Sequence, residues 1–157
     1  MAASICIKAA KLGLCPIVHI ANGGTHMDIK THNPSQWLTH FGLNHAVEVR
    51  GGERTLYLSG QTASDAEGEP LYAGDLVAQF QCAWDQLVKA LAMAGMTPEN
   101  LVRLNIYTLD VPAFMEAAEA IVPIYAGSGA QLAATLLGVR ELYHPDILIE
   151  IEGTAVA

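Results

Sequence analysis

Positive charge is scarce in this sequence of 157 residues, a length typical of one domain. Lys and Arg together number eight against sixteen Asp plus Glu, and no two of the eight cations are adjacent. Nucleic-acid binding needs clustered cations to neutralise phosphates, so we predict no nucleic-acid partner. Hydrophobic residues make up 52% of the chain and charged residues 15%. This balance excludes intrinsic disorder, because such a chain buries enough apolar surface to offset the entropy of ordering.

Cysteine is also rare, and the spacings typical of metal ligands are missing. The three cysteines match neither a zinc site nor a CxxC redox pair, which indicates a reduced, cytoplasmic setting. Three of the six histidines, His40, His45 and His144, fit no compact ligand spacing, and no Cys or Asp pair accompanies them. We therefore predict no metal site.

Long apolar runs are absent, so we expect no membrane span and no secretory signal. Residues 1–26 lack sustained periodicity and end in a Gly-Gly pair before Met27. Two interpretations stay open for them. They are either an extension from an upstream start, with Met27 as the alternative initiator, or a genuine flexible or strand-adding arm. We expect one domain over residues 27–157.

Strand patterns occur in five places. Residues 46–50 and 55–58 are short strand-like runs joined by a Gly-Gly turn, which predicts a β-hairpin. Residues 102–107 alternate strictly between apolar and polar, as a half-buried strand does. Two more strands are predicted over residues 135–139 and 147–155.

Two helices fit between these strands. Apolar residues recur with a 3.6-residue period from Asp75 to Ala94, and Gly95 suits the helix end. Asp110 followed by Pro112 predicts a second helix start, with the helix running to about Tyr125. The resulting order, β-β-α-β-α-β-β, predicts an α+β fold in which both helices cover one face of a single sheet.

The other face of that sheet has no helix to cover it. Its strands carry apolar residues on both faces, since Leu56 and Leu58 alternate with Tyr57, and Leu148 precedes Glu150. An apolar sheet face is either solvated or covered by another chain, and we predict a homo-oligomer.

Several segments resemble the RidA (YjgF) family over residues 43–157. They are LYLSGQTA after the Gly-rich turn, the stretch QFQCAWDQLVKALAMAGMTPENLVRLNIYTLD, the helix start PAF, and the terminal PDILIEIEGTAVA. The resemblance implies a chorismate-mutase-like fold and a trimer whose sheets form a central barrel. It also implies three small-molecule clefts between subunits.

The same resemblance implies hydrolysis of reactive enamines and imines derived from amino acids, without a metal or organic cofactor. In the family an arginine clamps the substrate carboxylate, a serine and backbone N–H groups help to hold it, and a glutamate positions the attacking water. The matching residues are Ser59 and Gly60 of the Ser-Gly-Gln motif and Glu150, the first acid of IEIE.

Other matched positions lack the polar groups that the family uses. No Lys or Arg lies between Pro112 and Val139, where the clamp is expected. The substrate-facing positions implied for the arginine, its neighbours, a helical asparagine and a tyrosine are Ala134, Thr135, Leu136, Ala118, and Leu43 or Phe41. A buried carboxylate without its guanidinium loses several kcal/mol, which amounts to several orders of magnitude in rate.

Three residues near the expected cleft mouth could replace the lost contacts. Arg140 is either a substitute clamp or a surface charge at a strand end. Tyr143 and His144 either supply new polar contacts and proton transfer or belong to an exposed turn before Pro145.

Three functional hypotheses follow. The first is an atypical RidA-like enzyme that hydrates, deaminates or eliminates at an imine, enamine or activated double bond of a ligand without a free carboxylate. The second is a non-catalytic ligand-binding or scaffold trimer. The third is an ordinary 2-imino acid deaminase that uses Arg140.

Overall fold

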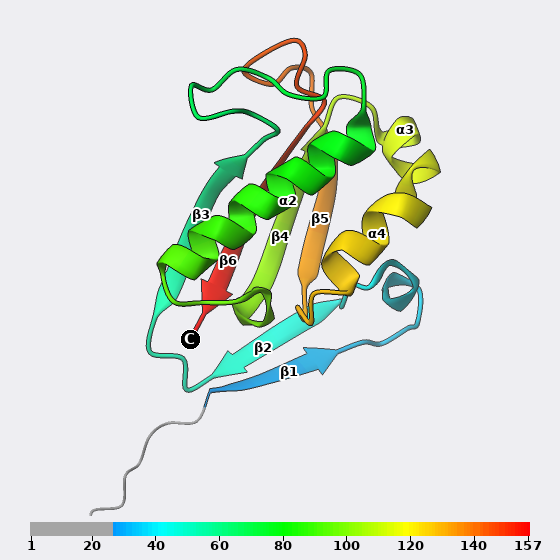
Figure 1. Cartoon of the computed structure of the whole chain (residues 1–157). Coiled ribbons are helices and arrows are strands. Elements are labelled where there is room, and N and C mark those ends of the chain that lie inside the picture. The colour runs from blue at the N-terminus through cyan, green and yellow to red at the C-terminus, as the bar shows by residue number, and fades with distance from the viewer. Residues whose placement is uncertain (1–26) are drawn as a thin grey trace, which may run out of the picture.

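Alternating buried side chains build the centre of the fold, which the computed structural model describes for residues 27–157. Strand β6 (Ile149–Val156) buries every second residue, and β4 (Leu101–Thr108) does so from Leu104 onward. They pair antiparallel at the middle of a four-stranded sheet of order β3-β6-β4-β5. Strand β3 (Thr55–Gln61) is antiparallel to β6, and β5 (Ala133–Gly138) is parallel to β4 (Figure 1). Our expectations for residues 1–26 lie outside the described residues.

The helices lie on one face of this sheet, as predicted. Helix α2 (Leu76–Met93) begins at Asp75, whose carboxylate accepts a hydrogen bond from Ala78 N at 3.0 Å. Its buried stripe packs on β6 and β3, diagonally across the sheet (Figure 1). Ring contacts of Phe80 with Phe114 and Tyr125 join α2 to the second helical segment.

The second helical segment is two helices, not the one that we expected to run to Tyr125. Asp110 caps it as predicted, accepting a hydrogen bond from Ala113 N at 2.9 Å. Helix α3 (Val111–Glu116) ends at Ala117, whose ψ of 0° and carbonyl bond to Ala120 N tighten the chain, and α4 (Ala118–Ala126) follows.

The predicted hairpin between residues 46–50 and 55–58 is wrong. Strand β2 (Ala46–Arg50) pairs instead with β1 (Asp28–His32), a strand that we did not predict, and these two form a separate ribbon. The reason lies in the linker, where Glu53 N and Arg54 N both bond to the carbonyl of Ala157 at 2.8 Å. These bonds tie the linker to the chain's last residue, so β3 continues along β6.

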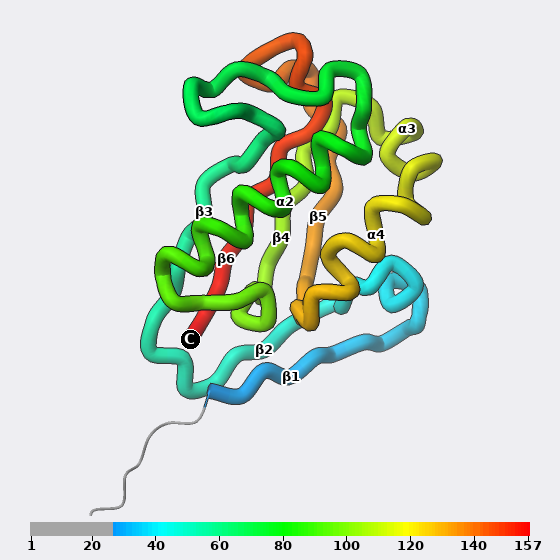
Figure 2. The backbone as a smooth tube through the Cα atoms, viewed as in Figure 1, coloured from blue at the N-terminus to red at the C-terminus, as the bar shows by residue number. Residues whose placement is uncertain are grey.

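Short 3₁₀ turns and two loops complete the described residues. The turns are η2 (Leu38–Phe41) and η3 (Pro98–Asn100). The loops 62–75 and 139–148 lie together at one end of the sheet (Figure 2), where Tyr143 OH donates to Gly68 O at 3.2 Å. Of the helices in this part of the chain, none is long and apolar enough to cross a membrane.

Candidate functional site

The Glu150 carboxyl lies on the open face of β6, directly against Gly60 of β3. Its neighbours Ile149 and Ile151 are fully buried on the helix side, so alternation directs Glu150 the other way. The β3–β6 register shifts between Leu58 and Gln61, which places a bulge at Ser59 and Gly60. A Cβ atom at residue 60 would lie 1.7 Å from Glu150 Oε1. The bulge and the missing side chain together make room for the carboxyl.

The Glu150 carboxyl ionises less readily than a carboxyl group in water. Burial raises the pKa of its carboxyl, and the negative charge of Glu152 raises it further. Within residues 27–157, no side chain donates a hydrogen bond to Glu150, so its oxygens are available to a ligand or a water molecule. A carboxyl with a raised pKa and free oxygens is suited to proton transfer.

Glu152 has the opposite environment. Tyr107 OH donates to Glu152 Oε1 at 2.7 Å, and Asn105 Nδ2 donates to the same oxygen at 2.8 Å. These bonds lower the pKa of Glu152, and the same contact raises the pKa of Tyr107. Glu152 therefore carries its negative charge more readily than Glu150 does.

An arginine that we did not predict as a site residue extends this network. Arg103 Nε donates to Asn105 Oδ1 at 3.0 Å, and its Nη2 donates to the hydroxyl of Thr135. A guanidinium therefore lies beside Thr135, one of the positions that the resemblance implies for the family's arginine, but it comes from the neighbouring strand β4. The spacing Arg103, Asn105, Tyr107 on one face of a strand was the available signal.

Arg103 is nevertheless far from Glu150 within one chain. Tyr107 is the cross-strand partner of Glu150, and Arg103 lies beside Thr154. Four residues of strand separate these two pairs, about 13 Å. The other candidate cation, Arg140, is exposed beyond the end of β5. Neither supplies a carboxylate clamp beside Glu150 in a single subunit.

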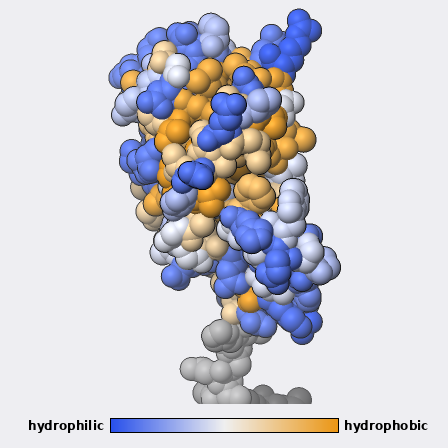
Figure 3. Space-filling view, turned by 90° about the vertical axis from the view of Figure 1, so that its right-hand side faces the viewer, coloured by the Kyte–Doolittle hydropathy of each residue, from blue (hydrophilic) through white to orange (hydrophobic). Residues whose placement is uncertain are grey.

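The positions that lost polar groups gather around an apolar hollow on the helix-covered side. Ala134, Leu136, Leu43 and Phe41 all line a cavity of about 250 Å³. Its remaining walls come from η2, β4, α3 and α4 and are Trp37, Leu38, Ile106, Phe114, Met115, Val122 and Tyr125. Figure 3 shows apolar surface gathered on the side of the molecule that carries α3, α4 and β5.

Polar groups are nearly absent from this cavity. The Tyr125 hydroxyl donates to Phe41 O at 2.6 Å and is therefore already paired. Ala118 lines a second, adjoining hollow together with Phe41 and Val122. The predicted substitutions of polar by apolar residues thus fall in one region, although Thr135 points to the opposite face, toward Arg103.

The structure does not bring the two halves of the predicted site together within one chain. Glu150 and Gly60 meet on the open face of the sheet, next to the exposed Ser59, whereas Ala134 and Leu136 face the helices. The sheet itself separates them. Within one chain, Glu150 and the apolar cavity therefore lie on opposite faces of the sheet.

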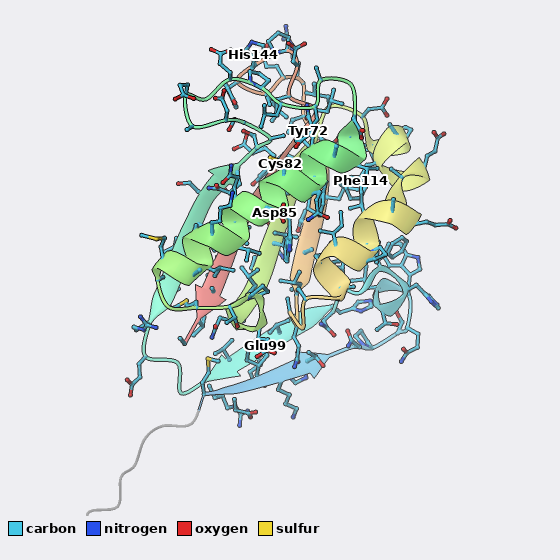
Figure 4. The ribbon with its side chains drawn as sticks, viewed as in Figure 1. Tyr72, Cys82, Asp85, Glu99, Phe114 and His144 are labelled. Atoms are coloured by element: carbon cyan, nitrogen blue, oxygen red, sulfur yellow. The ribbon has the colours of Figure 1, made fainter. Side chains whose placement is uncertain are left out.

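Tyr143 and His144 organise the loops near the Glu150 end of the sheet. Thr62 Oγ1 donates to Tyr143 OH at 3.4 Å, and His144 Nδ1 accepts a hydrogen bond from Asp146 N at 3.2 Å. His144 lies in the outer loop, away from the helices, whereas Phe114 points into the space between α2 and α4 (Figure 4). Within residues 27–157, no three His, Cys, Asp or Glu side chains lie close enough together to hold a metal ion.

Comparisons with known proteins bear on this geometry. Residues 39–157 match a family model described as Endoribonuclease L-PSP. A RutC family protein of Aquifex aeolicus (strain VF5) is 32% identical over 111 residues, which cover 68% of this chain and 82% of the relative. The crystal structure of YyfB from Yersinia pestis, described as a protein of unknown function of the conserved Rid family, is 38% identical. This match has a TM-score of 0.73 and covers 82% of this chain and 98% of the YyfB chain. The crystal structure of Rv2704 from Mycobacterium tuberculosis, described as a member of the highly conserved YjgF/YER057c/UK114 family, is 26% identical. Its match has a TM-score of 0.55 and covers 83% of this chain and 100% of the Rv2704 chain.

Proposed function

The chain belongs to this family, the Rid or YjgF family, and from that premise we propose that it is a small-molecule enzyme acting on an imine or enamine without a free carboxylate. The family model's description names an endoribonuclease. This chain has only eight cations, none adjacent to another, which disfavours binding of an RNA phosphate backbone. Small-molecule chemistry therefore remains the better interpretation.

The apolar cavity beside Ala134 is the observation that carries this proposal. Its lining residues include no Lys or Arg, and its tyrosine hydroxyl is already paired. A carboxylate entering such a cavity loses its hydration without gaining a guanidinium, at a cost of several kcal/mol. The part of the ligand that the family clamps as a carboxylate is therefore an apolar group here.

The size and walls of the cavity indicate that it also holds a larger apolar group of the ligand. An apolar cavity of roughly 150 Å³ takes up benzene in other proteins. The cavity here, at about 250 Å³, has room for a phenyl ring and its attachment. Trp37, Phe41 and Phe114 offer aromatic edges and faces for such a ring.

The Glu150 half of the site reaches this cavity only across an interface. Tyr57, on the open-face side of β3, is 80% exposed, and Leu137, on β5, is 50% exposed. Apolar groups on a sheet face without helices are suited to contact with another subunit. We propose a homotrimer in which Glu150 of one subunit faces the apolar cavity of the next.

The chemistry proposed for this cleft is addition of water to a C=N bond. The Glu150 carboxyl gives its proton to the imine nitrogen and takes a proton from the water molecule whose oxygen bonds to carbon, giving a carbinolamine. Collapse of the carbinolamine releases ammonia and leaves a ketone. The Ser59 hydroxyl and the Gly60 backbone orient the ligand, and the chain needs no metal or organic cofactor for these steps.

Binding of stable product analogues tests the ligand class. We expect phenylacetone, which is neutral, to bind to the full chain in calorimetry, and phenylpyruvate, which has a carboxylate in place of the methyl group, to bind at least tenfold more weakly. Leu136→Gln, inside the cavity, is expected to abolish binding of phenylacetone. Met93→Gln, at a 90% exposed position at the end of α2, is the matched control and is expected to bind normally. Tighter binding of phenylpyruvate contradicts the proposal.

A further inference from the structure

We infer that Glu152, held by Tyr107 and Asn105, is a positioning residue that adds to the effect of burial in disfavouring ionisation of Glu150, and so favours Glu150 as a proton donor. This inference deepens the proposed function and depends on it for its catalytic meaning. The protonation pattern itself is a property of the folded chain and is testable without a substrate.

The two carboxyl groups share one face of β6. Glu150 and Glu152 are two residues apart on the strand, so their Cα atoms are about 7 Å apart and their side chains point the same way. Two carboxylates this close disfavour each other's ionisation, and the group with the weaker stabilisation of its charge holds the proton. The surroundings of each group therefore decide which one is neutral.

Hydrogen bonds place the negative charge on Glu152. It receives donors from Tyr107 and Asn105 at 2.7 and 2.8 Å, respectively. Glu150 receives none from the described residues, and its carboxyl lies against Gly60. Tyr107 is the cross-strand partner of Glu150, yet its hydroxyl is committed to Glu152.

Arg103 fixes the direction in which Asn105 donates. Asn105 Oδ1 accepts a hydrogen bond from Arg103 Nε, which leaves the amide nitrogen to donate to Glu152. Arg103 is in turn held by the Thr135 hydroxyl on β5. The network therefore runs across three strands, from Thr135 on β5 through β4 to Glu152 on β6.

Few other charges face Glu150. On β6 the neighbour is Glu152, and on β4 it is Tyr107, with Arg103 farther along the strand. On β3 the neighbours are Ser59 and Gly60, which carry no charge. The charge of Glu152 is accordingly the one that acts on Glu150 most directly.

A proton on Glu150 suits a neutral imine. The carboxyl donates its proton to the imine nitrogen, which gives an iminium ion and a carboxylate. The carboxylate then takes a proton from the water molecule whose oxygen bonds to carbon, and this proton moves to nitrogen as the C–N bond breaks. The ketone first forms with a proton on its oxygen, and transfer of this proton to Glu150 restores the neutral carboxyl. In sum, one C=NH group and one water give one C=O group and one ammonia.

A ¹³C NMR titration of the side-chain carboxyl groups in the full-length protein tests the inference. The Glu150 signal is assigned by its loss in Glu150→Gln. In the wild type we expect Glu150 to titrate at a higher pH than Glu152. In Glu152→Gln we expect the pKa of Glu150 to fall, and in Glu116→Gln, a change at an exposed site on α3, we expect it to stay unchanged.

Tyr107→Phe provides a second variant that preserves the ring and its packing. It removes one donor from Glu152, so we expect the pKa of Glu152 to rise and its separation from that of Glu150 to narrow. An unchanged Glu150 titration in Glu152→Gln, or Glu152 titrating above Glu150 in the wild type, overturns the inference. Failure of ligand binding with the expected titrations intact contradicts the proposed function instead.

Discussion

The carboxyl of Glu150 rests on the backbone of Gly60, with Oε1 occupying the space in which any larger residue would carry its Cβ atom. The distance from that Cβ position to Oε1 is 1.7 Å, and to the Glu150 Cδ atom 2.7 Å. The bulge in β3 and the choice of glycine thus act on the same carboxyl. The position of Glu150 in the cleft depends on a residue that has no side chain.

Gly60→Ala is expected to displace the Glu150 carboxyl at a small cost in stability. The clashing atoms are the far end of a flexible side chain, so rotation of Glu150 relieves the overlap for about 1 kcal/mol or less. The proposed activity, in contrast, is expected to fall about as far as in Glu150→Gln. Urea unfolding and the imine assay described below measure the two effects.

The double variant Gly60→Ala/Glu150→Ala provides the control. With the carboxyl removed, alanine at residue 60 has nothing to displace, so its stability cost is expected to disappear in this background. A cost that persists in the double variant would instead locate the effect in the strand bulge itself.

Ala134→Arg is expected to destabilise the chain and not to create a carboxylate clamp. A guanidinium at this position enters the apolar cavity, whose lining residues include no Asp or Glu. Burying it unpaired costs about 3 kcal/mol or more. Ala134→Met, which fills part of the same cavity with an apolar chain, serves as the matched variant and is expected to lose less than about 1.5 kcal/mol. Thermal unfolding of both variants checks the difference, and equal stability would contradict the apolar description of the cavity.

Stability is expected to depend on pH with opposite signs for the two acids of β6. The pKa of Glu152 is lowered in the folded chain. The stability that this group contributes is therefore present when the pH is above its ordinary pKa of 4.5, and it is lost as the pH falls through the pKa of the folded state. The pKa of Glu150 is raised in the folded chain. The stability that this group contributes is therefore present when the pH is below 4.5, and it is lost as the pH rises through the pKa of the folded state.

At pH 7, Glu150→Gln is therefore expected to raise the free energy of unfolding, whereas Glu152→Gln lowers it. The loss in Glu152→Gln is about 0.5–1 kcal/mol, since Glu152 is only half-buried and water partly replaces its hydrogen bonds. Both differences are expected to shrink at pH 3. Urea titrations at the two pH values measure them, and destabilisation by Glu150→Gln at pH 7 would contradict the raised pKa.

Arg103→Lys is expected to weaken the cross-strand network although the charge is kept. A lysine has no planar fork with which to reach Asn105 and Thr135 together. We expect a loss of about 1 kcal/mol, and we expect Thr135→Ala to add little in the Arg103→Lys background. Fully additive losses would show that the two side chains do not act as one unit.

Much of the fold was predictable because strand alternation and helix caps are local signals. The alternation of β4 and the cap at Asp110 were confirmed. The hairpin prediction failed because the linker at Glu53 and Arg54 bonds to Ala157, more than a hundred residues away, and no local pattern encodes that contact. The strand β1 was missed because its short polar sequence has no apolar alternation.

The candidate site was predictable only where one motif carries its residues. Ser59, Gly60 and Glu150 come from recognisable motifs, and the structure brings Gly60 and Glu150 into contact. Arg103 was not predicted because it lies on the neighbouring strand, outside residues 112–139, where the resemblance implies the arginine. Strand register places Arg103 near Thr135, and register depends on packing across the whole sheet.

A matched pair of imines tests the central claim most directly. The compounds 1-phenylpropan-2-imine and 2-imino-3-phenylpropanoate differ only in that a methyl group replaces the carboxylate, and both are generated freshly from the amines by an oxidase. We predict that the full-length protein accelerates decay of the neutral imine at least tenfold more than that of the imino acid, and that Glu150→Gln abolishes the acceleration. Acceleration confined to the imino acid, or an equal rate in Glu150→Gln, would contradict the account.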